Sequence, residues 1–146
     1  MSKLLTSFIF FIVVNIAFAQ NKDEAVFFTQ NSRIDRFHTI DDLEGLKKGD
    51  LLTLYAARAE EIITILPYIA LTNEPGIRLS DVGIKENSTH LKTIKKHKES
   101  TNQSLQTTKE TIEELIPYAD TERIIWTILY YEDIIKKMRI GFKGNF

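Results

Sequence analysis

The sequence contains no cysteine among its 146 residues. This absence excludes a disulfide framework, a thiol nucleophile and haem attachment through a C-x-x-C-H motif. It also excludes a lipoprotein, because lipid attachment requires a cysteine just after the leader. The chain must therefore be stable through its hydrophobic core alone, and it is long enough to form one domain with such a core.

An excess of charge of either sign is also missing. The formal net charge is -1, while 43% of the residues are hydrophobic and 27% are charged. This balance is typical of a folded globular domain and excludes disorder of the whole chain. It provides no overall attraction to nucleic acid or to a membrane, so we expect no nucleic-acid partner.

Known catalytic motifs are absent as well. No serine lies in a G-x-S-x-G setting, and no glycine loop of the phosphate-binding type occurs. His90 and His97 share a helical face, but they lie roughly 10 Å apart along the axis, too far to bind one metal ion. We interpret all three histidines and the pairs Glu60-Glu61 and Glu113-Glu114 as solvated. We predict no catalytic residue, cofactor or metal site, and hence no enzyme.

The apolar run at the N-terminus has the form of a secretory leader. Lys3 precedes a mostly apolar stretch, and Ala17 and Ala19 occupy the two small-residue positions that signal peptidase reads. We predict a signal peptide over residues 1–19, a single domain over residues 20–146, and export to the periplasm or the medium. The alternative is an uncleaved anchor, although the run is shorter than the roughly 20 residues that a span needs. The start resembles that of small exported bacterial proteins, and this resemblance is confined to the leader.

Three stretches show apolar side chains at steps of three and four residues, which is typical of amphipathic helices. They cover about residues 50–71, 88–118 and 121–139. Asp50, Asn87 or Ser88, and Asp120 are the predicted N-caps. The short connection before Asp120 predicts that the last two helices are antiparallel neighbours. The predicted fold is all-α, an up-and-down bundle of three main helices with an N-terminal wrapping segment.

Three parts of the pattern allow alternatives. Pro67 either kinks the first main helix, which we favour, or opens a new turn. The polar stretch over residues 100–104 is either part of one continuous helix, which we favour, or a hinge between two. Residues 25–28 fit a helix or a strand, and residues 41–48 a short helix that ends at Gly49. The predicted anchors of this N-terminal segment are Phe27, Phe28, Ile34, Phe37 and Leu43.

Two features are candidate interaction sites. The pair Pro67-Tyr68 recurs as Pro117-Tyr118, and two such corners could place their phenol groups around one groove; the alternative is that each proline only ends a helix. Basic residues also gather at the start of the second helix and the end of the third, which would meet if these helices are antiparallel. The basic residues are Lys92, Lys95, Lys96, Lys98, Lys136, Lys137 and Arg139.

These observations lead to three hypotheses about function. The first is a non-enzymatic exported module that binds another protein or an envelope surface. The second is a carrier of a small apolar ligand between the helices, with a packing gap at the polar stretch beside Tyr55, Trp126 and Tyr130. The third is an enzyme assembled from scattered Glu, His and Tyr residues.

The predicted leader can be tested by cell fractionation. We expect the protein outside the cytoplasm, with an intact mass that corresponds to a chain starting at Gln20. Intact precursor free in the cytosol would contradict the predicted export.

Overall fold

The computed structural model describes residues 24–141, so the predicted leader and residues 142–146 lie outside the described part. The helices are α2 (Ile40–Glu44), α3 (Lys48–Ile65), α4 (Ser88–Leu115) and α5 (Thr121–Ile140). Short 3-10 turns cover Gln30–Ser32, Leu66–Tyr68, Ser80–Val82 and Ile116–Tyr118. The prediction of an all-α bundle with three main helices is confirmed. None of the helices in residues 24–141 has the length and apolar character to cross a membrane.

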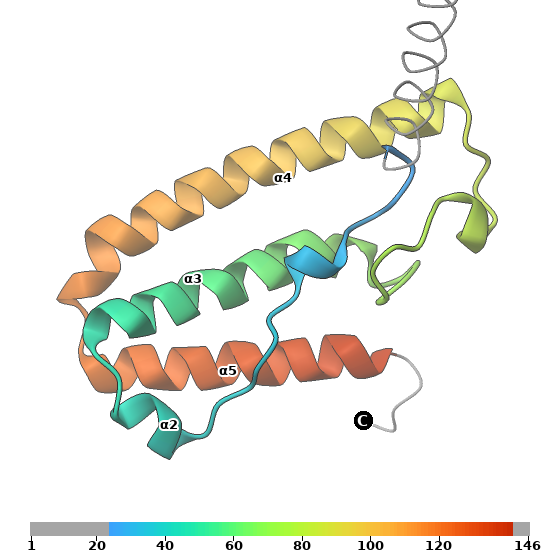
Figure 1. Ribbon diagram of the computed structural model, residues 1–146. Coiled ribbons are helices and arrows are strands. Elements are labelled where there is room, and N and C mark those ends of the chain that lie inside the picture. Colours follow the sequence, from blue (N-terminus) through green and yellow to red (C-terminus); the bar gives the residue numbers. More distant parts are fainter. Residues whose placement is uncertain (1–23, 142–146) are drawn as a thin grey trace, which may run out of the picture.

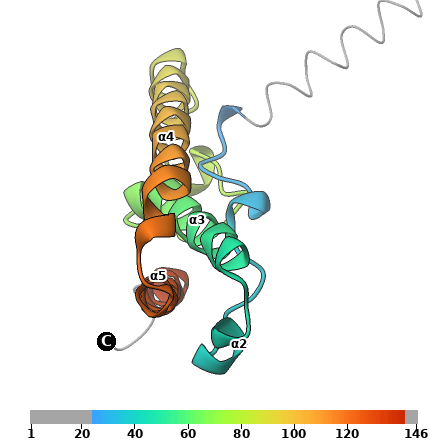
Figure 2. The ribbon, with the colours of Figure 1, turned by 90° about the vertical axis from the view of Figure 1, so that its left-hand side faces the viewer.

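The three main helices lie side by side with α3 in the middle (Figures 1 and 2). α3 packs against α5 and, less extensively, against α4. α4 and α5 run antiparallel, as predicted, but they are not packed neighbours, because α3 lies between them. α4 stays close to α3 at its C-terminal end and diverges from it toward Ser88 (Figure 1).

Side-chain hydrogen bonds to the backbone cap the start of α4 and satisfy hydroxyl groups further along it. The Asn87 side chain accepts a hydrogen bond from the His90 backbone N–H, which caps the first turn as predicted. The polar stretch in the middle is helical, and no hinge interrupts it. Thr107 and Thr108 each donate a hydroxyl hydrogen bond to the carbonyl one turn earlier, so these hydroxyl groups are satisfied within the helix.

Pro67 and Pro117 each follow the end of a helix and do not kink it. α3 stops at Ile65, and Pro67 lies in a separate 3-10 turn, so the favoured kink was wrong and the alternative was correct. Because proline has no N–H to donate to the carbonyl four residues back, the chain tightens into the 3-10 turn. Pro117 does the same after α4. Both helices are therefore shorter at their C-terminal ends than predicted.

The start of α3 also differs from the prediction. Thr39 and Asp42 form a capping box that starts α2 earlier than expected, and Gly45 ends it. Gly49 therefore lies inside α3, and Asp50 is an acidic residue of its first turn rather than its cap. At the same end of the bundle Asp120 is the N-cap of α5, as predicted, although its side chain makes no capping hydrogen bond.

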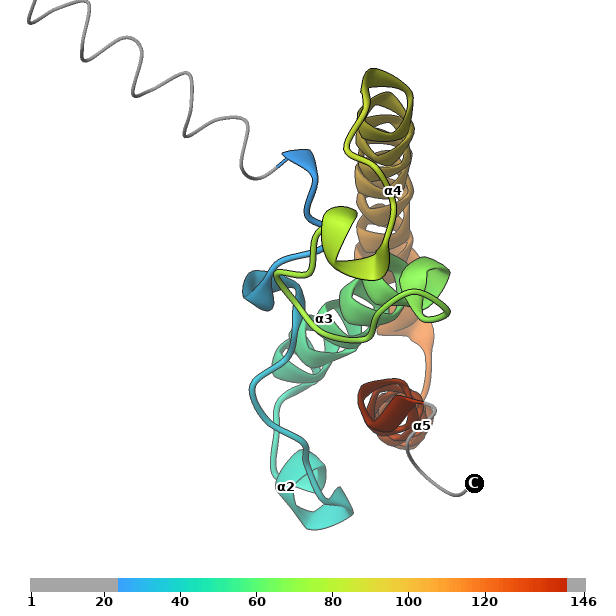
Figure 3. The same cartoon turned by 90° about the vertical axis from the view of Figure 1, so that its right-hand side faces the viewer.

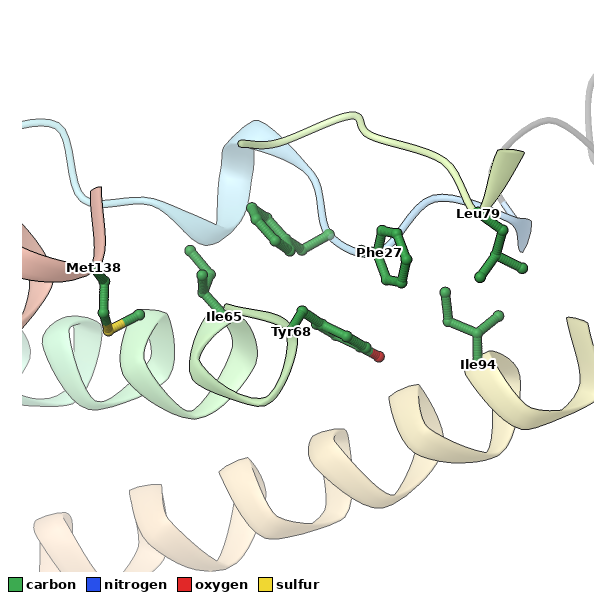
Figure 4. Close-up of a cluster of buried hydrophobic side chains, with 7 residues drawn as sticks. Phe27, Ile65, Tyr68, Leu79, Ile94 and Met138 are labelled. Atoms are coloured by element: carbon green, nitrogen blue, oxygen red, sulfur yellow. The ribbon is translucent and has the colours of Figure 1, made fainter. Parts of the chain in front are cut away.

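The core consists of two clusters of buried side chains. The first, drawn in Figure 4, joins the N-terminal segment, the end of α3, the 71–87 connection, α4 and α5. The second joins α2, the start of α3 and α5. Of the predicted anchors, Phe27, Phe28 and Leu43 are buried in these clusters, and Ile34 and Phe37 are half-buried.

The N-terminal segment is held on the bundle by backbone hydrogen bonds as well as by its anchors. The N–H of Phe27 donates to the carbonyl of Ile77 (3.0 Å), and that of Leu79 donates to Ala25 (3.0 Å). These bonds pair the segment with the connection after α3, beside which it lies in Figure 3. The prediction that the segment wraps the bundle is confirmed. Residues 25–28 form neither a regular helix nor a strand, and Val26 makes an isolated antiparallel β-bridge with Arg78.

Candidate binding cleft

The divergence of α4 from α3 leaves a cavity at the wide end of the bundle. Its volume is about 530 Å³. The 3-10 turn after α3 contributes Tyr68, and the rest of the connection to α4 contributes Leu79 and Ile84. α4 closes the other side with Ile94 and His97. The walls are mostly apolar, and the polar groups are confined to a few side chains.

A second, smaller cavity of about 240 Å³ lies beside the first. The two cavities share Phe27, Tyr68 and His97, so these three side chains form the boundary between them. The smaller cavity is more polar. The polar residues that line it are Thr29, Ser32, Glu60, Thr64, Lys98, Thr101 and Asn102.

A hydrogen bond holds the two polar groups at the boundary together. The Tyr68 hydroxyl oxygen lies 2.7 Å from His97 Nδ1, and the two rings meet edge to face with centroids 4.9 Å apart. Burial raises the pKa of Tyr68, so the hydroxyl stays protonated at neutral pH. Figure 4 shows this oxygen pointing out of the hydrophobic cluster, toward α4. The tautomer of His97 decides which of the two groups donates in this bond.

The packing gap predicted at the polar stretch of α4 is present, but the aromatic residues predicted beside it are not its neighbours. The polar part of α4 does face a cavity, through Lys98, Thr101 and Asn102. The aromatic residues expected beside it lie elsewhere. Tyr55 packs on Tyr131 with the hydroxyl oxygens 3.3 Å apart, and burial together with this bond raises the pKa of Tyr55 to about 12. Trp126 and Tyr130 point away from the bundle with exposed fractions of 55% and 65%.

A buried charge network lies on the other side of α3, between α3, α5 and the N-terminal segment. Glu132 is fully buried, and its Oε1 accepts from Arg58 Nε (3.0 Å) and Nη2 (2.7 Å). The backbone N–H of His38 donates to Glu132 Oε2 (2.7 Å), and the His38 ring nitrogen Nδ1 lies 3.0 Å from Oε1. Both carboxylate oxygens are therefore satisfied, as a buried charge requires.

A second ion pair continues this network. Arg139 donates to Glu61 through Nε (2.9 Å) and Nη2 (2.8 Å), and Glu61 is 1% exposed. Both partners also bind the backbone of Ile34, through its N–H and its carbonyl. The two pairs thus join α3 to α5 and hold the N-terminal segment against them.

Three groups that we interpreted as solvated are instead buried, as Glu61 is, or half-buried, as His38 and His97 are. Glu61 and His38 belong to the charge network, and His97 bonds Tyr68. Only His90 is exposed, with its Nδ1 near the carbonyl of Lys85. The sequence did contain a signal for the network, because Arg58, Glu61 and Glu132 lie among the apolar positions of their helices. A charge at such a position has to be paired when it is buried.

The two Pro-Tyr pairs do not flank a common groove. Tyr68 lies after α3 at the wide end of the bundle, where it is 9% exposed. Tyr118 lies after α4 at the opposite end and is 89% exposed (Figure 1). Only the first pair contributes to the cleft.

The basic residues share one end of the bundle without forming one surface. α3 separates the start of α4 from the end of α5 (Figure 3). On α5, Arg139 is engaged with Glu61, Lys137 with Asp133 (3.4 Å), and Lys136 lies over the ring of Phe37. On α4, Lys92, Lys95 and Lys96 are exposed, whereas Lys98 is half-buried at the smaller cavity.

The described chain places no group of three or more His, Cys, Asp or Glu residues where they could hold a metal ion. No protein-family model matches the sequence, and no curated protein or solved structure matches it significantly. The cleft and the charge network are therefore interpreted from their own chemistry.

The charge network predicts a large effect of a small substitution. Glu132→Gln keeps the shape of the side chain but leaves Arg58 buried without a counter-charge, so we expect the free energy of unfolding to fall by about 3 kcal/mol or more. Urea unfolding followed by circular dichroism measures this change.

Asp133→Asn is the matched control. Its carboxylate is exposed and pairs with Lys137 one turn away, so it should change the free energy of unfolding by less than about 0.5 kcal/mol. Equal effects of the two substitutions would show that Glu132 has no special role in the fold.

Proposed function

We propose that this protein is a non-enzymatic binding protein, and that its ligand is a small, largely apolar molecule held in the larger cavity between α4 and the chain that connects it to α3. The observation that carries the proposal is this cavity of about 530 Å³ with mostly apolar walls. Small-molecule sites typically have volumes of roughly 300–1,000 Å³, with apolar walls and a few well-placed polar groups. Tyr68 and His97 are such groups here.

The surroundings of the cavity support a binding role. Its floor is the buried cluster around Phe27 and Tyr68, which is packed from several elements of the fold. Its outer wall is the diverging half of α4, in which Ile94 is buried and the neighbouring Thr93 is exposed. With the predicted export, the protein would carry its ligand in the periplasm or outside the cell, where an apolar molecule is otherwise exposed to water.

Filling the cavity from α4 tests this function. The purified protein should increase the fluorescence of N-phenyl-1-naphthylamine, a neutral apolar dye, in a saturable titration. Thr93→Trp puts a bulky ring into the cavity without removing a core side chain, and we expect it to weaken dye binding about tenfold or more, a loss of about 1.4 kcal/mol.

The control for this variant is Thr107→Trp. Both threonines donate a hydroxyl hydrogen bond to the carbonyl one turn earlier on α4, but Thr107 lines neither cavity. The control should bind the dye as the unmodified protein does. An absence of saturable dye binding, or equal binding by both variants, would overturn the proposed function.

The exposed aromatic residues on α5 favour a second candidate, a module that binds another envelope protein. Trp126 and Tyr130 lie one turn apart on the outer side of α5, and large exposed aromatic side chains are enriched where proteins bind one another. A Trp126→Ala, Tyr130→Ala variant should lose a protein that the unmodified chain captures from envelope extract. An extract from which the unmodified chain captures nothing would speak against this candidate.

A further inference from the structure

The outer side of α5 carries a stripe of exposed side chains with aromatic rings at its centre. α5 lies at one edge of the row of main helices, so this side faces away from α3 (Figures 1 and 2). The stripe follows steps of three and four residues, which keep its members on one face of the helix. Its members, all exposed, are Arg123, Trp126, Tyr130, Asp133 and Lys137. The described chain therefore leaves this face open to a partner.

The charges on this stripe are placed symmetrically about the two aromatic residues. Arg123 precedes the midpoint between Trp126 and Tyr130 by as many positions as Asp133 follows it, which is roughly 7.5 Å along the axis on each side. Two copies of α5 packed antiparallel about this midpoint would set Arg123 of each copy opposite Asp133 of the other. Trp126 of each copy would then meet Tyr130 of the other. A surface that is complementary to itself in this way is what a two-fold interface requires.

Both charged groups are available for such a contact. The Arg123 guanidinium forms no ion pair within residues 24–141. Asp133 pairs only with Lys137 on the same helix, at 3.4 Å, and an exposed pair of this kind contributes little to stability, so the carboxylate can accept a second cation. The net charge of -1 produces little repulsion between two copies of the chain.

The same charges select one arrangement of the two helices. A parallel arrangement would set like charges opposite each other. An antiparallel arrangement shifted by one turn toward Lys137 would set Arg123 of one copy against this lysine of the other. Like charges held together disfavour an interface, so the charge order favours the antiparallel arrangement centred between Trp126 and Tyr130.

We propose that the outer side of α5 is the interface of a homodimer, in which two copies of α5 pack antiparallel about a two-fold axis between Trp126 and Tyr130. This inference is independent of the proposed ligand, because no residue of α5 lines the larger cavity. It assigns to a second copy of the chain the aromatic surface considered above for another protein. Four aromatic side chains, two from each copy, bury about 600–1,000 Å² at most, which is small for a specific interface. We therefore expect a dissociation constant in the micromolar range.

The fluorescence of Trp126 tests the homodimer directly, because this residue is the only tryptophan of the chain. Sedimentation equilibrium of the purified protein from low to high micromolar concentration should show a monomer–dimer equilibrium. Over the same range the emission maximum should move to shorter wavelength, as the indole ring passes from water into an apolar contact. The two measurements should give the same dissociation constant.

Two charge reversals test the arrangement of the helices. Arg123→Glu and Asp133→Lys each create two contacts between like charges in the homodimer, so each should weaken dimerisation about tenfold or more. A mixture of the two variants should associate again, because the introduced glutamate meets the introduced lysine at one contact and Arg123 meets Asp133 at the other. Lys96→Glu reverses an exposed charge on α4 and should leave the dissociation constant unchanged.

Three results would overturn the homodimer or its placement. A monomer at every concentration, with constant Trp126 emission, would remove the homodimer, and a shift of that emission only on addition of envelope extract or of anionic vesicles would assign the surface to another protein or to a membrane. A dimer that tolerates both α5 reversals, or that Lys96→Glu weakens equally, would place the interface elsewhere. Two α5 variants that stay monomeric when mixed would exclude the antiparallel pairing of Arg123 with Asp133.

Discussion

Charge compensation between α3 and α5 is the constraint on which the rest of the structure depends. Arg58 and Glu61 lie one turn apart on α3, and each binds a buried or half-buried partner on α5, Glu132 and Arg139. Sliding one helix past the other by a turn would leave these charges in the core without partners, which typically costs several kcal/mol. The pairs thus favour one register between α3 and α5, and the same carboxylates hold the backbone of the N-terminal segment at Ile34 and His38.

α4 is held in a different way, and the cleft follows from that difference. In its 28 residues only Ile94, Leu105 and Ile112 are buried, so it contacts α3 through widely spaced apolar side chains. Most of the polar residues between them are exposed, and the diverging half of the helix borders both cavities. The ion pairs thus fix how α3 packs on α5, whereas the packing of α4 leaves room for a ligand.

The helices could be predicted from the sequence because their apolar periodicity and their caps are local properties. The pairing of the buried charges could not be predicted, since the partners Glu61 and Arg139 are 78 positions apart and only the packing of α3 on α5 brings them together. The same applies to Tyr68 and His97, 29 positions apart. The turn between α4 and α5 indicated their directions but not that α3 would lie between them, because a short connection does not determine which faces pack.

The two Pro-Tyr turns show how far a local pattern determines a site. Both prolines follow a helix and tighten the chain into a 3-10 turn, so the local structure is the same in each case. Tyr68 meets the N-terminal segment and α4, becomes buried and bonds His97, whereas Tyr118 meets neither and remains exposed. The difference arises from what surrounds each turn. Phe27 and Phe28 of the N-terminal segment pack on Tyr68. The charge network and the backbone hydrogen bonds to the 71–87 connection hold this segment in place. The boundary of the cleft therefore depends on the buried charges on the far side of α3, even though no residue of that network belongs to its lining.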